Sequence, residues 1–275
     1  MSYKINSFIA SEKEVASYEK RLSICLTSNG FSFSVTTVQD ELLAIGDVEC
    51  NLKASMSEII ADIKGALSDA HIQPFGLKEK ELVVFSRQFV WVPQHLYDEK
   101  KQRGYLEALC TIDAGCCVAV DYNEHIKSYM VFSADNGIVS AFKIAVPGLA
   151  VRCQHSKMVN ATVLNNSEMK SVLLMNVRNG EADFAVMCNK KLQISNTYDC
   201  ANFDETIYHA LNLTKHFHLE DAMLVVAVCG DIDRERFARL RGYFPSVALY
   251  TGRSLTLTKP EMQHLPIYRS ALILS

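Results

Sequence analysis

The sequence predicts an α/β fold made of two similar halves, each with the order strand, strand, strand, helix, strand. Two Asn-Gly pairs, Asn29-Gly30 and Asn179-Gly180, lie between runs of β-favouring residues, which is typical of tight hairpin turns. A helix-capping pair follows each hairpin at nearly the same distance. Two distant segments with the same order of local signals indicate a duplicated unit. Chance repetition of two common motifs is the alternative.

The first copy begins with the hairpin. Apolar residues alternate with serines over residues 31–35, as in a half-buried strand. Ser55 and Glu58 form a capping-box pair before a helix that has apolar residues at helical spacing. The four strands of this copy are predicted at residues 22–27, 31–35, 42–48 and 82–85.

The second copy repeats this order. Asn202 and Glu205 form the second capping-box pair, and apolar residues recur at helical spacing over residues 203–214. The four strands of this copy are predicted at residues 172–177, 184–188, 192–195 and 223–229.

The rest of the chain completes the two halves. The remaining elements are expected to be helices at residues 93–109, 137–146, 156–164 and 234–240, and strands at residues 126–132 and within 247–257. The helix at 156–164 would cross over between the halves, which should pack as neighbours around a cleft. We therefore place the first half at residues 1–155, with a small insertion around 93–125, and the second half at residues 156–275.

Composition and charge restrict the class of protein. With 275 residues, of which 49% are apolar and 21% charged, the chain should bury a sizeable core. The 28 basic and 31 acidic residues are interspersed, which argues against a nucleic-acid ligand because phosphate neutralisation needs clustered Lys and Arg. No apolar run approaches the roughly 20 residues of a membrane helix, and no signal peptide is visible. We expect a cytoplasmic protein without an integral membrane segment, whose nine cysteines are reduced core thiols.

The duplicated plan resembles the actin-like ATPase superfamily, with two ribonuclease-H-like halves around a cleft. That superfamily includes sugar kinases, Hsp70 chaperones and bacterial division and pilus-assembly proteins. The best local match, residues 173–186, resembles its second phosphate loop. The segment from Asn189 through the helix predicted to begin at Phe203 resembles the type IV pilus assembly member. More narrowly, the chain is similar to uncharacterised bacterial proteins of unknown function with an actin-like fold. The resemblance implies a first phosphate loop within 22–34 and adenosine-binding glycines within 227–240.

The first of these loops lacks the residues that the superfamily's chemistry needs. Glycines let backbone N–H groups surround a phosphate, and a carboxylate in each loop holds Mg²⁺ or its waters. Aligned without gaps, this loop has Cys25 where the superfamily has Asp and Thr27 where it has Gly, before Asn29 and Gly30. A thiol is a poor ligand for Mg²⁺.

The second predicted phosphate loop also lacks residues of the superfamily's pattern. Asn176 stands in place of the Asp, Arg178 and Asn179 stand in place of glycines, and only Gly180 is retained. Asn keeps a carbonyl oxygen but lacks the charge that holds a hard cation. We therefore expect degenerate phosphate loops with no catalytic residue and no metal.

The residues around these loops have competing interpretations. The third loop has a single glycine, Gly230, followed by Asp231, where a glycine pair would let the backbone approach adenosine. Asp183 could serve as a relocated Mg²⁺ ligand, but we expect a solvent-facing residue of the return strand. Arg178 could contact an anion, but we expect a solvated residue in a surface turn.

Two other groups suggest metal binding only weakly. His216 and His218 would point to different faces of a helix, so we expect solvation at a helix end. Cys116 and Cys117 cannot face one site if they lie on a strand, because neighbouring residues alternate sides.

These observations predict a pseudo-ATPase with no cofactor, acting as a scaffold or adaptor that binds a protein partner. The alternative is weak or atypical binding of ATP and Mg²⁺ in the cleft, with Asn176, Gly180 and Gly230 lining it and Asp183 or another carboxylate holding the metal. A small-molecule enzyme using the same cleft is a third class. The chain contains no Gly-x-Ser-x-Gly, phosphate-loop Gly-x-x-x-x-Gly-Lys or His-Glu-x-x-His signature, which weakens the enzyme interpretation.

Overall fold

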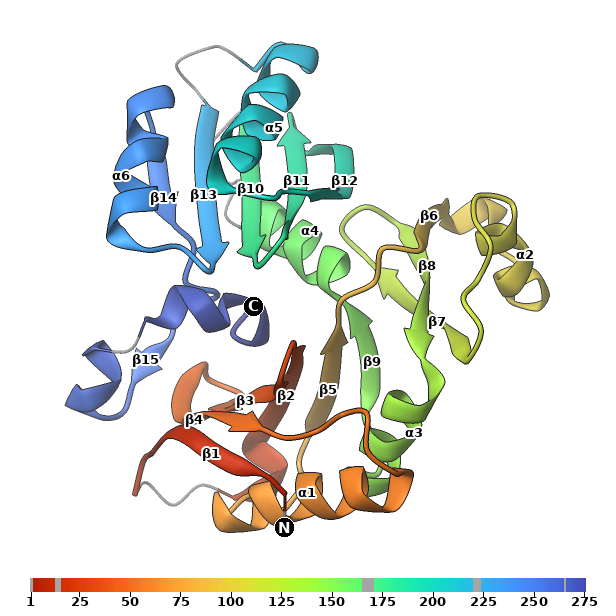
Figure 1. Cartoon of the computed structure of the whole chain (residues 1–275), viewed down its shortest axis with the longest axis vertical. Helices are drawn as coiled ribbons and strands as arrows, with labels where there is room; N and C mark the ends of the chain where they lie inside the picture. The colour runs from red at the N-terminus through yellow and green to blue at the C-terminus, as the bar shows by residue number, and fades with distance from the viewer. Residues whose placement is uncertain (1, 13–15, 165–170, 220–223, 265) are drawn as a thin grey trace.

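The computed structural model of the protein describes residues 2–12, 16–164, 171–219, 224–264 and 266–275. Figure 1 shows two large sheets at opposite ends of the molecule, with a smaller sheet beside the lower one. No helix among the described residues is long and apolar enough to span a membrane.

The first half contains a seven-stranded sheet with the strand order β1-β4-β3-β2-β5-β9 and with β15 paired to β4. Strands β2, β3 and β4 form an antiparallel meander, and β5 pairs in parallel with β2. The elements of this half are β1 (Lys4–Ala10), β2 (Lys20–Thr27), β3 (Gly30–Thr37), β4 (Glu41–Glu49), α1 (Met56–Asp69), β5 (Glu79–Val84), α3 (Asn136–Ala145), β9 (Ala150–Cys153) and β15 (Thr256–Leu257).

The second half contains a five-stranded sheet with the order β12-β11-β10-β13-β14. Its first three strands are again an antiparallel meander, and β13 again pairs in parallel with the first of them. The elements are β10 (Ser171–Arg178), β11 (Glu181–Cys188), β12 (Lys191–Asp199), α5 (Phe203–His216), β13 (Leu224–Gly230), α6 (Arg234–Tyr243) and β14 (Val247–Leu249). The series β2-β3-β4-α1-β5 and β10-β11-β12-α5-β13 share one topology, as the repeated hairpin and cap signals predict. Met223, at the start of one predicted strand, lies outside the described residues.

A third sheet of three antiparallel strands, in the order β6-β8-β7, lies beside the first half. Its elements are β6 (Phe89–Pro93), α2 (Gln102–Glu107), β7 (Cys116–Asn123) and β8 (Ser128–Asp135), with short 3-10 turns at Gln94–Leu96 and Glu99–Lys101. The helix expected over 93–109 is therefore broken into short pieces. Tyr97 stacks on Tyr129 with ring centroids 3.7 Å apart, which anchors the first of these turns to β8.

The helix caps set the start of the repeated helices. Ser55 and Glu58 form the predicted capping box, in which each side chain accepts the other residue's backbone N–H. Asn202 also caps α5, but the Glu205 carboxylate accepts the N–H of Ala201 instead of Asn202. The second cap is therefore not the reciprocal box that the sequence predicts.

Both faces of the first sheet are covered. Helices α1 and α3 pack on one face, where Phe31 and Phe33 are fully buried. The serines that alternate with them on β3 are buried as well, and Ser34 Oγ donates to Ile273 O at 3.1 Å. The expected half-buried strand is therefore buried on both sides, because the C-terminal part of the chain covers its second face.

Two elements connect the halves. Helix α4 (Gln154–Leu164) crosses from β9 to the second sheet, as predicted. The C-terminal segment, residues 250–264 and 266–275, returns from β14 toward the first half, and its strand β15 pairs with β4. The tail strands expected to complete the second half are therefore divided between the two sheets. The 3-10 helix at Ile267–Ile273 contacts both β13 and β2, so this segment lies between the halves.

Candidate functional site between the two halves

The second predicted phosphate loop forms a tight hairpin whose polar side chains face each other across the strands. Asn176 on β10 pairs with Asp183 on β11, and the Asn176 side-chain amide donates to Asp183 Oδ2 at 2.9 Å. Asn179 and Gly180 form the turn and are exposed, with Gly180 at a φ of 79°. The turn geometry agrees with its Asn-Gly sequence.

Asp183 is fully buried, with 0% of its side chain exposed, so the expectation of a solvent-facing residue is wrong. The reason is the cover on both faces of β11. Ala182 and Phe184 pack toward α5, while Asp183 and Ala185 face α4 on the other side. Strand β11 therefore has no solvent face, and its buried acid, Asp183, needs partners within the protein.

Those partners include Arg178, whose guanidinium makes two hydrogen bonds of 2.9 Å to the two oxygens of Asp183. Thr197 Oγ1 donates to Asp183 Oδ1 at 2.7 Å. Burial alone would raise the pKa of Asp183, but the Arg178 guanidinium and the hydrogen bonds from Arg178 and Thr197 outweigh it and hold that pKa below its ordinary value. Asp183 is therefore an ionised carboxylate whose two oxygens are both occupied.

Arg178 is not the solvated turn residue that the sequence suggests. Its side chain is 23% exposed, and the guanidinium lies over the ring of Phe85, 4.4 Å from the ring centroid. Phe85 follows β5 of the first half, so this contact joins the two halves. Glu181 Oε2 lies 2.7 Å from Arg178 Nη2 on the remaining side.

Helix α4 completes the buried network with two residues that sequence reasoning missed. His155 contacts Thr197 Oγ1 at 2.9 Å through Nε2 and Ser195 Oγ at 2.7 Å through Nδ1. Burial lowers the pKa of His155 to about 4, so the ring is neutral at pH 7. Gln154 donates to Ser86 O at 3.0 Å and thereby ties α4 to the chain after β5. The adjacent polar pair Gln154-His155 at the start of a crossover helix is the only sequence signal for them.

The first predicted loop is divided by the structure. Cys25 is buried in an apolar cluster with Val83 and Ile273, and burial raises the pKa of its thiol to about 12. Thr27 and Asn29 lie at the exposed turn of the β2–β3 hairpin. The structure therefore brings only Cys25 to the region between the halves. A buried thiol of this kind is a small apolar group rather than a ligand.

The glycines retained in the predicted loops have structural roles. A Cβ added to Gly230, whose φ is 85°, would lie 2.2 Å from the carbonyl oxygen of Val177. A Cβ added to Gly30 would lie 2.1 Å from the carbonyl oxygen of Val48. Close approach of neighbouring strands explains both glycines without a nucleotide. Asp231, which follows Gly230, is exposed and lies 3.3 Å from Arg236 Nη1.

The donor set does not fit Mg²⁺–ATP. Mg²⁺ takes oxygen ligands, usually carboxylates together with phosphates, and the carboxylate nearest the predicted loops is already held by a guanidinium, an amide and a hydroxyl. Within the described ranges, no three His, Cys, Asp or Glu side chains are grouped to hold a metal ion.

Comparison with solved structures identifies the fold of the chain. A crystal structure from Bacteroides thetaiotaomicron VPI-5482, a protein with an actin-like ATPase fold and unknown function, is 16% identical, with a TM-score of 0.69 over 85% of this chain and 91% of that one. A PilM–PilN type IV pilus biogenesis complex is 11% identical, with a TM-score of 0.57 over 94% of this chain and 98% of that one. The predicted actin-like ATPase fold is therefore confirmed.

Within that class, the chain belongs to the family described as protein of unknown function DUF3822, which matches residues 10–247. No curated protein matches the chain.

Proposed function

We propose that this protein is a non-catalytic actin-like scaffold that binds a protein partner and does not use ATP. The observation that carries the proposal is the buried pair of Arg178 and Asp183, which stands where the superfamily has a glycine-rich phosphate loop. A triphosphate seated there would compete with Asp183 for the guanidinium. The displaced carboxylate would then be left buried without its cation, which is strongly unfavourable.

The fit between the halves supports the same proposal. Arg178 contacts Asp183 through its edge and Phe85 through its face, so both recognition surfaces of the guanidinium are in use. Cys25 is packed among apolar side chains on the opposite side. Nothing among these groups offers the backbone N–H cradle or the free carboxylate that nucleotide hydrolysis needs.

The partner-binding part of the proposal is an analogy at the level of the fold. A PilM–PilN complex contains a protein of this fold together with a second protein. This chain also has large apolar side chains that are exposed on and near the third sheet: Leu96 in the 3-10 turn after β6, Leu109 after α2, and Tyr122 on β7. A contiguous patch of exposed apolar and aromatic side chains is typical of a protein-binding surface.

Calorimetry of the purified protein with ATP and Mg²⁺ tests the nucleotide part. We expect no binding at millimolar ATP, no shift in melting temperature and no phosphate release. Mg²⁺-dependent ATP turnover that disappears in Asp183→Asn, in a variant whose circular dichroism spectrum matches the parent, would contradict the proposal and favour the atypical ATPase.

Affinity capture with matched variants tests the partner part. Leu96→Asp and Leu109→Asp place a charge on the third sheet's side of the molecule, and Tyr208→Asp does the same on α5 of the second half. We expect a partner that is retained by the parent and by Tyr208→Asp and lost from the other two variants. The same proteins captured equally by all four baits would contradict a partner surface at this place.

A further inference from the structure

Residues 266–275 lie between the two halves of the chain and contact both. They include the 3-10 helix at Ile267–Ile273, which contacts β13 of the second half as well as β2 and β3 of the first half. Figure 1 shows the C-terminus between the two large sheets. We call residues 266–275 the clasp.

Neighbouring residues of the clasp are buried in opposite halves. Ala271 and Leu272 belong to an apolar cluster with residues of β10, β11 and β13, whereas Ile273 and Leu274 belong to a second cluster with residues of β2, β4 and β5. All four residues are at most 5% exposed. Burial of apolar side chains on both sides therefore joins the two sheets through one short segment.

Side chains from both sides donate hydrogen bonds to the clasp, but no sheet includes it. Ser34 Oγ on β3 donates to Ile273 O at 3.1 Å, and Lys157 Nζ on α4 donates to Ser275 O. The clasp, whose residues are all described, contains no strand, so no ladder of backbone hydrogen bonds fixes it to either half. Its 3-10 helix is interrupted at Ser270, whose φ of -106° and ψ of 16° are not helical. Apolar contacts are therefore its main attachment.

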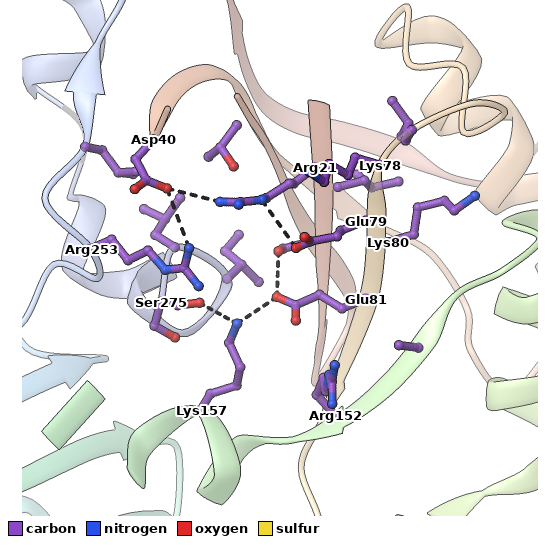
Figure 2. Close-up of a pocket in the computed structure, with 18 of the residues that line it drawn as sticks. Arg21, Asp40, Lys78, Glu79, Lys80, Glu81, Arg152, Lys157, Arg253 and Ser275 are labelled. Atoms are coloured by element: carbon purple, nitrogen blue, oxygen red, sulfur yellow. Dashed lines mark hydrogen bonds and ion pairs between the residues drawn. The ribbon is translucent and has the colours of Figure 1, made fainter. Parts of the chain in front are cut away.

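A charged pocket of about 390 Å³ runs along one side of the clasp. Ile273, Leu274 and Ser275 line it, together with residues from the starts of β2 and β5. Figure 2 shows Lys157 between Glu81 and Ser275 in this pocket, with Lys157 Nζ 2.7 Å from Glu81 Oε1. A pocket lined by charged side chains holds water, so water reaches one side of the clasp.

The clasp also covers one thiol in each half. Cys25 on β2 lies in the same cluster as Leu274, and Cys229 on β13 lies in the same cluster as Leu272. The two cysteines are 7% and 0% exposed. Burial raises the pKa of both thiols, and a protonated thiol reacts slowly with alkylating reagents. Each thiol therefore reports whether the clasp is seated on its half.

We propose that residues 266–275 form a releasable clasp, which holds the two halves in one arrangement when seated and opens the space between them when it leaves both halves as one unit. A segment held by apolar contacts without a backbone ladder, and in contact with water on one side, opens at a lower free energy than the core of either sheet. Release uncovers Cys25 and Cys229 together, because successive residues of one short helix cover them. This inference does not rest on the proposed scaffold function, since it needs neither a partner nor a nucleotide.

Alkylation of the full chain by N-ethylmaleimide under native conditions, followed for each cysteine by mass spectrometry of peptides, tests the clasp. Cys153 is the internal control, because it is 0% exposed and belongs to the cluster between the first sheet and its helices. We expect Cys25 and Cys229 to react at one common rate, about tenfold or more faster than Cys153. Low concentrations of urea should raise the rates of Cys25 and Cys229 in parallel.

Two variants test whether the two sides of the clasp open together. Leu272→Ala removes apolar contact with the second half. Gly252→Ala acts from outside the clasp, since an added Cβ would lie 2.6 Å from Leu274 Cβ. Each variant should raise the alkylation rates of both Cys25 and Cys229 about tenfold, although each change touches one side only.

Arg269→Ala is the matched control, because it removes an exposed side chain of the same 3-10 helix, and it should leave both rates unchanged. The proposal is wrong if Cys25 and Cys229 of the parent react no faster than Cys153, because the clasp then opens only when the whole chain unfolds. It is also wrong if Leu272→Ala speeds the reaction of Cys229 alone, since the two sides then open separately. The comparison within the parent decides the question even if a variant does not fold.

Discussion

Replacing Arg178 by Met should destabilise the protein by about 3–5 kcal/mol, because it leaves a buried carboxylate without its cation. Asp183 has no exposed surface, and two of its hydrogen bonds, both 2.9 Å long, come from the Arg178 guanidinium. Asn176 and Thr197 would still donate to it. Met fills a similar volume over Phe85, so the loss is mainly electrostatic.

The size of the effect has an upper limit that depends on pH. Asp183 can escape an unpaired buried charge by taking up a proton, and protonating a carboxyl with an ordinary pKa near 4 at pH 7 costs about 4 kcal/mol. The destabilisation by Arg178→Met should therefore shrink as the pH falls from 7 toward 4. In the parent, the pKa of Asp183 is lower in the folded state than in the unfolded state. The pair therefore stabilises the parent fully at a pH above the unfolded-state pKa of Asp183, and this stabilisation is lost as the pH falls through the folded-state pKa.

Urea unfolding followed by fluorescence of Trp91, the single tryptophan of the chain, measures these differences. The double variant Arg178→Met/Asp183→Asn removes both charges and should be more stable than the sum of the two single changes predicts, by about 2–3 kcal/mol. Arg87→Met is the matched control, because its side chain is 50% exposed and pairs with exposed Asp199. It should cost about 1 kcal/mol or less. A loss below about 1 kcal/mol for Arg178→Met, or strict additivity in the double variant, would refute the reasoning.

Three further predictions concern stability. His155→Gln should flatten the pH dependence of the free energy of unfolding. The pKa of His155 is about 4 in the folded state against about 6.5 in the unfolded state, so the parent loses about 3 kcal/mol of stability as the pH falls from 6.5 to 4. Urea unfolding midpoints across that pH range check this. Gly230→Ala should lower stability by more than about 2 kcal/mol, since the added methyl group clashes with Val177 and the residue has a positive φ. Gly180→Ala also has a positive φ but meets no atom within 4 Å, so it should lower stability by about 1 kcal/mol. Equal losses of stability in the two variants would contradict the packing role of Gly230. Ser55→Ala should lower stability by about 1 kcal/mol through loss of the α1 cap, with Ser68→Ala, an exposed position of the same helix away from the cap, as the control in the same melting experiment.

Local signals predicted the repeated units correctly. The Asn179-Gly180 turn and the Ser55 cap each depend on a few neighbouring residues, so the chain shows them without tertiary context. Strands β1, β6, β7 and β9 were missed. Strand β1 lies at the edge of its sheet and β9 has only four residues, so both carry weak periodic signals.

Burial of polar residues was the main failure of sequence reasoning. Asp183 and Ser34 each alternate with apolar neighbours, which is also the pattern of a strand with one face in water. The residues that cover them, on α4 and in the C-terminal segment, are distant in sequence. The pairing of β15 with β4 is non-local in the same way, since its register is set by residues more than 200 positions earlier. The partners of Asp183 could not be predicted for this reason.

The first sheet is completed only by residues of the C-terminal segment, which are made long after its own strands. The hydrogen bond from Ser34 to Ile273 joins residues 239 positions apart, and Leu274 belongs to the apolar cluster around Cys25. Before this segment is made, α1 can cover one face of the first sheet, but Ser34 and Cys25 on the other face have no covering residues from it. Without this segment, one face of the first sheet, including Cys25 and Ile45, would be uncovered.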